Sequence, residues 1–139
     1  TPVAVNASAP ISIMGIMVGQ EATGLGSGFN LHAGDPAIFL VPPDRQFRRE
    51  YVFLTPDTYF SDYVTVVTQR GNEIQLDGAA VNLADTAAVV GSDYIFKHVE
   101  LPRDGPHRIQ GQQPFGILVY AYDDYVSYAF TGGLNLTKQ

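Results

Sequence analysis

The chain contains no cysteine and no tryptophan, and only two of its eight basic residues are lysines, Lys97 and Lys138. The absence of cysteine excludes disulfide bonds, thiolate zinc sites and cysteine nucleophiles. The chain has 14 acidic and 8 basic residues, so its formal net charge is −6. This balance argues against nucleic acid as a partner, since nucleic-acid binding depends on clustered Lys and Arg that face phosphates. It argues equally against docking on anionic membranes.

Long apolar runs are also absent. The longest, residues 11–18, is interrupted by Ser12 and Gly15 and falls well short of the roughly 18 residues that span a bilayer. We therefore expect no transmembrane segment. The chain begins at Thr1 without a methionine and has no signal peptide, so we expect a piece of a longer protein whose targeting signals lie outside it.

The residues that are present predict one globular all-β domain over residues 1–139. Of the 139 residues 45% are hydrophobic and 16% charged, and there are 14 Gly, 9 Pro, 8 Tyr and 8 Phe. Alternation of apolar and polar residues dominates. It predicts strands over residues 2–7, 11–18, 37–41, 49–54, 63–69, 73–76, 93–101, 107–109, 115–122 and 125–130. About ten short strands at this spacing indicate an antiparallel β-sandwich.

Three local signals refine this prediction. Asp77-Gly78 is a strong hairpin signal, and Pro114 marks a turn between the strands 107–109 and 115–122. Residues 83–89 are compatible with one helical turn, although the segment is short and uncapped. The run 115–122 is apolar on both faces, which predicts a central strand covered on both sides. One face then carries Phe115, Ile117, Val119 and Ala121, and the other carries Leu118, Tyr120 and Tyr122.

Tyrosine provides the main binding signal. Tyrosine offers flat apolar area and one polar group at low entropic cost, which suits both glycan stacking and protein interfaces. Packing within a sheet is the competing explanation. The candidate ligand-binding residues are Tyr120, Tyr122, Asp123, Asp124, Tyr125 and Tyr128.

Asp123 and Asp124 are also weak calcium candidates, because acidic loops at the end of a sandwich can supply the oxygen ligands that calcium takes. The alternative is a plain turn, since Asp favours turn geometry. No other cofactor is expected.

Catalytic signals are weak. His32, His98 and His107 are not spaced as metal-ligand pairs, and each fits a satisfied or solvent-facing role better than a catalytic one. No nucleophile or acid–base constellation stands out. We therefore expect no catalytic residues and a protein that is not an enzyme.

Two blocks of sequence resemble a known family. The first includes Gly34-Asp35-Pro36-Ala37, Leu40-Val41-Pro42-Pro43, Gln46-Phe47-Arg48 and Tyr51-Val52-Phe53-Leu54-Thr55-Pro56. The second includes Gly105-Pro106-His107, Gln113-Pro114-Phe115-Gly116, Tyr120, Tyr125-Val126-Ser127-Tyr128 and Gly132-Gly133-Leu134-Asn135-Leu136. Over residues 3–136 the chain resembles the domain named for the N-terminal region of IgGFc-binding protein.

This resemblance implies an extracellular or cell-surface location and a non-catalytic binding or adhesion role towards a protein or a glycan. It supplies no ligand residues. The lack of cysteine differs from the cysteine-rich modules that accompany the domain in animals, and this favours a bacterial source. The competing hypothesis is a purely structural module of a surface fibre, stalk or larger assembly.

Overall fold

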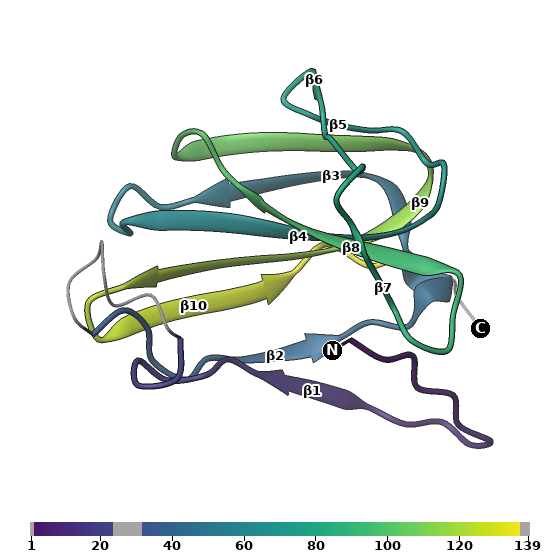
Figure 1. Cartoon of the computed structure of the whole chain (residues 1–139), viewed down its shortest axis with the longest axis horizontal. Helices are drawn as coiled ribbons and strands as arrows, with labels where there is room; N and C mark the ends of the chain where they lie inside the picture. Colours follow the sequence, from purple (N-terminus) through teal and green to yellow (C-terminus); the bar gives the residue numbers. More distant parts are fainter. Residues whose placement is uncertain (1, 24–31, 137–139) are drawn as a thin grey trace.

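The computed structural model describes residues 2–23 and 32–136, and the regular secondary structure of this part consists of antiparallel strands and one short 3-10 turn (Figure 1). Part of the segment over residues 20–36, for which the sequence predicts no strand, lies outside the described residues. The elements are β1 (Ile13–Ile16), β2 (Ile38–Val41), the 3-10 turn η1 (Asp44–Gln46), β3 (Arg48–Thr55), β4 (Ser61–Gln69), β5 (Ile74–Leu76), β6 (Ala79–Ala80), β7 (Ala87–Ala88), β8 (Tyr94–Glu100), β9 (Gly105–Asp123) and β10 (Val126–Thr131). The prediction of an all-β antiparallel domain is confirmed.

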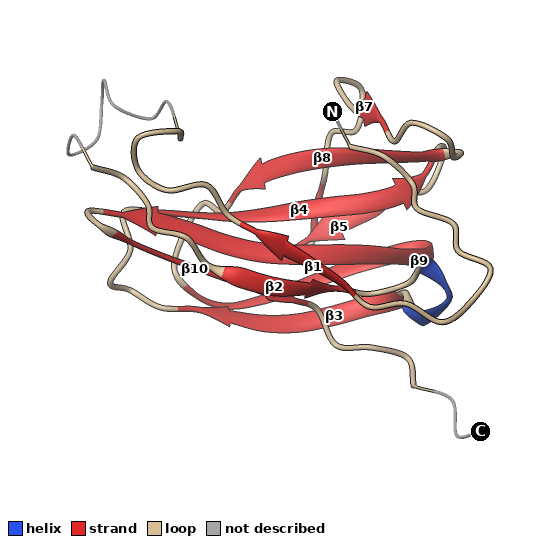
Figure 2. Cartoon of the chain, turned by 90° about the horizontal axis from the view of Figure 1, so that it is seen from below, coloured by secondary structure: helices blue, strands red, loops and turns tan. Residues whose placement is uncertain are grey.

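Two packed layers share strand β9. The first half of β9 pairs with β3 on one side and β5 on the other, and β6 follows at the outer edge. The second half pairs with β4 and β10, and β8 and β7 extend this layer beyond β4. Figure 2 shows the two layers from the side, with β4 and β8 lying across from β3. A strand that passes from one sheet into the other is a known way of closing the corner of a sandwich.

The core lies between the layers and follows the alternation of the strands. On β9 the predicted inner face is buried throughout. The cluster of buried apolar residues consists of Tyr51, Phe53, Val64, Val66, Ile74, Leu76, Leu101, Ile109, Phe115, Ile117 and Val119. The opposite face of β9 is only half-buried, so the expectation of full cover on both sides holds on the inner side alone.

The predicted turn at Pro114 is wrong, because β9 runs unbroken through it. The pairing with β3 skips from Gln110 to Phe115, so that the residues between them bulge out of the ladder. Asn72 compensates for the missing strand neighbour: its amide group accepts from the Gln113 N–H at 2.9 Å and donates to the Gln113 carbonyl at 3.0 Å. Proline has no N–H to satisfy and is tolerated at such a bulge.

Two further segments differ from expectation. Residues 83–89 form no helical turn, because Ala87 and Ala88 pair with β8 as strand β7. Residues 2–7 form no regular strand, and Val3 makes an isolated parallel bridge to Val90. Residues 87–88 take their partners from the edge of β8, whereas residues 2–4 pair with Val90, which follows β7. The local sequence reveals neither partner.

Strands β1 and β2 form a separate two-stranded sheet that lies beside β10 (Figure 1). The register pairs Met14 with Leu40 and Ile16 with Ile38, which places these four side chains on one face. All four are exposed. The small sheet therefore presents an apolar face to solvent. Over the described residues, the chain contains no helix that is long and apolar enough to cross a bilayer.

We predict that Val119→Asp abolishes cooperative unfolding, because Val119 is 0% exposed at the centre of β9 and an unpaired buried carboxylate costs several kcal/mol. Thermal melting followed by circular dichroism measures this. The matched control is Val52→Asp on β3, where the valine is 72% exposed and the protein should melt cooperatively. A soluble Val119→Asp protein with a normal melting transition would contradict the assignment.

Candidate functional site

The hairpin between β9 and β10 ends in an exposed tyrosine that stacks on a histidine. The Tyr125 ring lies 4.2 Å from the His32 ring, with 16° between their planes. His32 also places its Nδ1 3.5 Å from Asp124 Oδ1. The backbone holds the two segments together, because the Tyr125 N–H donates to the His32 carbonyl at 2.9 Å and the Gly34 N–H donates to the Asp123 carbonyl at 2.8 Å. We call Tyr125, His32 and Asp124 the hairpin tip.

Tyr125 has an unusual backbone conformation. Its φ of 54° lies in the left-handed region, where a bulky side chain is rare. Such a conformation costs about 1–2 kcal/mol and persists only where the surrounding structure imposes it. The side chain nevertheless remains 55% exposed, so burial does not explain why a tyrosine occupies the position. Strain of this kind at an exposed aromatic residue is a reason to look for a function there.

A row of aromatic side chains extends from the hairpin tip across the outer face of the β4–β8–β9 layer. Tyr63 stacks on Tyr120 with ring centroids 5.4 Å apart, and Tyr122 meets both rings edge-on. His98 meets the Tyr120 ring edge-on at 6.1 Å. The four residues come from three adjacent strands, and the antiparallel register places them on one face. We call them the aromatic row.

Two polar groups of the aromatic row, the Tyr120 hydroxyl and the His98 ring, lie within hydrogen-bond distance of each other. Burial raises the pKa of Tyr120 to about 12, and burial lowers the pKa of His98 below its usual value. His98 Nδ1 lies 2.7 Å from Thr65 Oγ1 and 3.0 Å from the Tyr120 hydroxyl. Burial also raises the pKa of Tyr122, so Tyr120, Tyr122 and His98 are uncharged at neutral pH, and the acidic residues Asp123 and Asp124 follow directly on the chain.

Tyr128 does not belong to this surface. It pairs with Ala121 on the inner side of β10, where its ring meets Tyr59 edge-on and its hydroxyl donates to Asp62 Oδ1. Asp62 is 3% exposed, and its other oxygen has no partner among the described residues. Burial raises the pKa of this carboxyl group, and nearby Asp104 adds to the effect. Of the six candidate residues, the structure therefore brings five to one surface and places Tyr128 inside.

Asp123 and Asp124 form a turn in which Asp123 Oδ1 accepts the Asp124 N–H at 2.7 Å. Within residues 2–23 and 32–136, no group of three or more histidine or acidic side chains is placed to hold a metal ion. One carboxylate is thus engaged by the backbone and the other by His32, whereas calcium takes six to eight oxygens.

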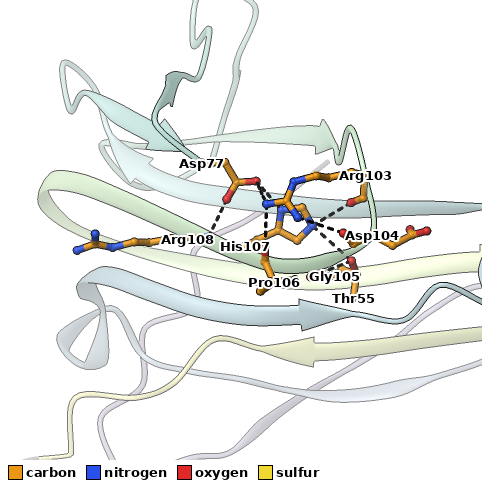
Figure 3. A network of polar contacts seen from close by, with 8 residues as sticks. All are labelled: Thr55, Asp77, Arg103, Asp104, Gly105, Pro106, His107 and Arg108. Atoms are coloured by element: carbon orange, nitrogen blue, oxygen red, sulfur yellow. Dashed lines mark hydrogen bonds and ion pairs between the residues drawn. The ribbon is translucent and has the colours of Figure 1, made fainter.

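The sequence did not reveal a second polar cluster, which joins the β5–β6 turn to the start of β9 (Figure 3). His107 Nδ1 lies 2.7 Å from Asp77 Oδ2, and its Nε2 lies 3.0 Å from the Arg103 carbonyl and 3.4 Å from Thr55 Oγ1. Asp77 also accepts from the Arg103 guanidinium at 3.1 Å and from the Arg108 N–H at 2.9 Å. We call this cluster the Asp77–His107 clamp.

The clamp has the composition of a catalytic dyad but the geometry of a structural link. The His107 side chain is fully buried, and both of its ring nitrogens are engaged within the protein, so neither faces a substrate. Asp77 and Gly78 have φ values of 51° and 85°, which confirms the predicted hairpin turn. Burial raises the pKa of Asp77, but the hydrogen bonds from the Arg108 backbone and the His107 ring outweigh this effect and lower it below its usual value.

These observations define an all-β sandwich with an exposed aromatic and acidic surface, a class of structure typical of binding modules. A comparison with protein families matches residues 1–121 to the family described as IgGFc binding protein. The chain belongs to this family. The match ends at residue 121, so it includes His32 of the hairpin tip but not Asp124 or Tyr125. The chain matches no curated protein significantly, and no solved structure matches it.

We predict that Asp77→Asn lowers the free energy of unfolding by about 2 kcal/mol at pH 7, because it removes the charge from three hydrogen bonds. Since folding lowers the pKa of Asp77, the carboxylate stabilises the fold above its unfolded pKa, and this contribution is lost as the pH falls through the folded value. Below about pH 4 the difference between the variant and the parent should therefore shrink. Denaturant unfolding at several pH values measures it.

The matched control is Glu50→Gln, which breaks the exposed ion pair between Glu50 and Arg108. Exposed pairs contribute little, so this variant should unfold like the parent. A difference between the Asp77→Asn protein and the parent that stays constant down to pH 2 would contradict the role assigned to the carboxylate.

We predict that calcium leaves the melting temperature unchanged and produces no binding heat in calorimetry, because the Asp123–Asp124 turn offers too few free oxygens. Magnesium serves as the control for ionic strength. A calcium-specific heat that disappears in Asp124→Asn would show that the turn is a calcium site.

Proposed function

We propose that the chain is a non-catalytic extracellular module that binds a protein or a glycan through the hairpin tip and the aromatic row. Its family membership supports a binding role, and the family description favours a protein over a glycan as the partner. The partner, the extracellular location and the lack of catalytic activity are parts of the proposal. The Asp77–His107 clamp, in which both ring nitrogens are engaged, gives no reason to assign a reaction.

The observation that carries the proposal is Tyr125. A tyrosine that is exposed, held at a left-handed φ and oriented by a stacked histidine is pre-organised to meet a partner. Pre-organised aromatic side chains lose little entropy on binding and are enriched among the residues that dominate binding energy. The neighbouring carboxylates of Asp123 and Asp124 add negative charge, so the surface suits a partner with basic groups or with hydroxyl donors.

A structural role in a surface assembly is the second candidate, and the apolar face of β1 and β2 favours it. Met14, Ile16, Ile38 and Leu40 are exposed together on that face, which suits packing against a second copy of the chain. Light scattering after size-exclusion chromatography distinguishes the two functions. A strict monomer at high concentration favours the binding module, whereas an ordered oligomer that is lost in Ile16→Thr favours the assembly.

We predict that Tyr125→Gly abolishes binding but keeps the free energy of unfolding within about 1 kcal/mol of the parent value, because relief of the left-handed strain offsets the lost stacking. Immobilised immunoglobulin Fc fragment tests the protein partner named in the family description, and a glycan array tests the alternative ligand class.

Val52→Ala on the far side of the first layer is the control and should bind normally. Tyr122→Ala tests whether the aromatic row contributes as well. Binding that survives both Tyr125→Gly and Tyr122→Ala would move the recognition surface elsewhere. If neither the Fc fragment nor any glycan on the array binds the parent protein, the proposal is contradicted for both ligand classes.

A further inference from the structure

The two layers do not close around the core, and their free edges face a common cleft. The strand order β6-β5-β9-β4-β8-β7 runs continuously through β9, and the β5–β6 hairpin at one end of it and β8 near the other end line the same cleft. A cleft of about 590 Å³ lies between them, lined by the β5–β6 hairpin and the residues after it on one side and by residues 97–100 of β8 on the other. We call this cleft the seam.

Strand β8 offers unpaired backbone groups to the seam. Among the described residues, β7 pairs with β8 only at Ile95 and Phe96, so residues 97–100 extend beyond it. The Leu101 N–H donates to the Asp62 carbonyl on the β4 side, and the Val89 N–H donates to the Tyr94 carbonyl on the β7 side. Because backbone direction alternates along an antiparallel strand, the groups of His98 and Glu100 point away from β4. All four residues from 97 to 100 line the cleft, which requires that the edge of the strand, not one of its faces, is turned towards it.

The geometry points to the seam as a docking site for an extended segment of a partner protein, which adds to β8 as a further strand. Addition of a strand to an exposed sheet edge is a common mode of peptide recognition, in which the backbone gives affinity and alternate side chains give specificity. The seam is separate from the hairpin tip and meets the aromatic row only at His98. The segment pairs with the His98 backbone and not with its ring, so the inference does not depend on the function proposed for the aromatic row.

The side chains around the seam define the chemistry of the segment. Leu76, Val81 and Val99 supply apolar surface on its floor, and Val81 and Val99 are only partly buried. The Lys97 ammonium group contacts the neutral Asp85 carbonyl at 3.3 Å, so its charge is not matched by that contact. Arg103, in contrast, is already paired with Asp77. Lys97 and Val99 lie on one face of β8, and Glu100 lies on the other. The segment that fits therefore has an apolar residue opposite Val99 and, on the same face, an acidic residue opposite Lys97.

The absence of cysteine allows a direct test with a tethered peptide. In Ala80→Cys, an exposed small residue at the rim of the seam becomes the only cysteine of the chain. It is joined by a disulfide to a peptide with the sequence cysteine, glycine, glycine, valine, threonine, valine, threonine, glutamate, in which both valines and the glutamate lie on one face of the strand. Tethering raises the effective concentration of the peptide. The expected result is that amide hydrogen exchange at His98 and Glu100, followed by NMR, slows by at least about tenfold, while exchange at Tyr125 is unchanged.

Two controls separate strand addition from simple crowding. A peptide N-methylated at alternate residues cannot form the ladder and should give no protection. Glu100→Pro removes one N–H from the seam side and should weaken protection at His98, whereas Glu100→Ala, which changes only the side chain, should not. If Glu100→Pro does not fold, the N-methylated peptide and Glu100→Ala still decide the question.

Three results would overturn the inference. The first is unchanged exchange at His98 and Glu100 with the tethered peptide, and the second is equal protection by the N-methylated peptide. The third is a dimer in light scattering whose His98 and Glu100 amides are already protected before tethering, since this would assign the seam to a second copy of the chain.

Discussion

The architecture depends on one strand serving two sheets. β9 supplies the inner faces of both layers, with Ile109 buried in the first and Val119 in the second. Two features let the strand make this passage: the bulge opposite β3, which is satisfied by Asn72, and the glycine at position 116. A Cβ atom at Gly116 would lie 2.4 Å from the Phe47 ring, so only glycine lets this ring cover the outer face of the strand. Any change in β9 therefore affects both layers.

The alternation of inward and outward side chains on β9 and its neighbours also determines which tyrosines reach the surface. Tyr120 and Tyr122 point outward because Val119 and Ala121 point inward, and the register with β4 brings Tyr63 alongside. Tyr128 on β10 lies opposite Ala121, so its side chain points inward like that of Ala121. There its hydroxyl donates to the buried Asp62. The aromatic row is thus a consequence of the core, and its rigidity follows from the three paired strands beneath it.

The sequence predicts most of the strands because burial on one face imposes a period of two, which local patterning reveals. It also predicts the Asp77-Gly78 turn, because few residues tolerate a positive φ. It does not predict the continuity of β9, because the groups that replace the missing neighbours come from Asn72, about 40 residues earlier in the chain. The Asp77–His107 clamp and the stacking of His32 on Tyr125 are unpredicted for the same reason. Both join residues that are distant in sequence, so no local sequence pattern indicates them.

The open seam raises the question of how the chain avoids indiscriminate strand pairing, since free sheet edges favour aggregation. Three features restrict the seam. Residues 81–86 connect the two layers and cover part of the gap with Val81 and Leu83, so only a short stretch of β8 is free. Lys97 places a positive charge beside that stretch, which disfavours a wholly apolar strand. Pro102 follows the stretch and cannot donate to a longer ladder. These features exclude an arbitrary strand but still allow a short strand that carries an acidic residue opposite Lys97 to bind. Protection of the edge and selectivity at the seam therefore have the same physical origin.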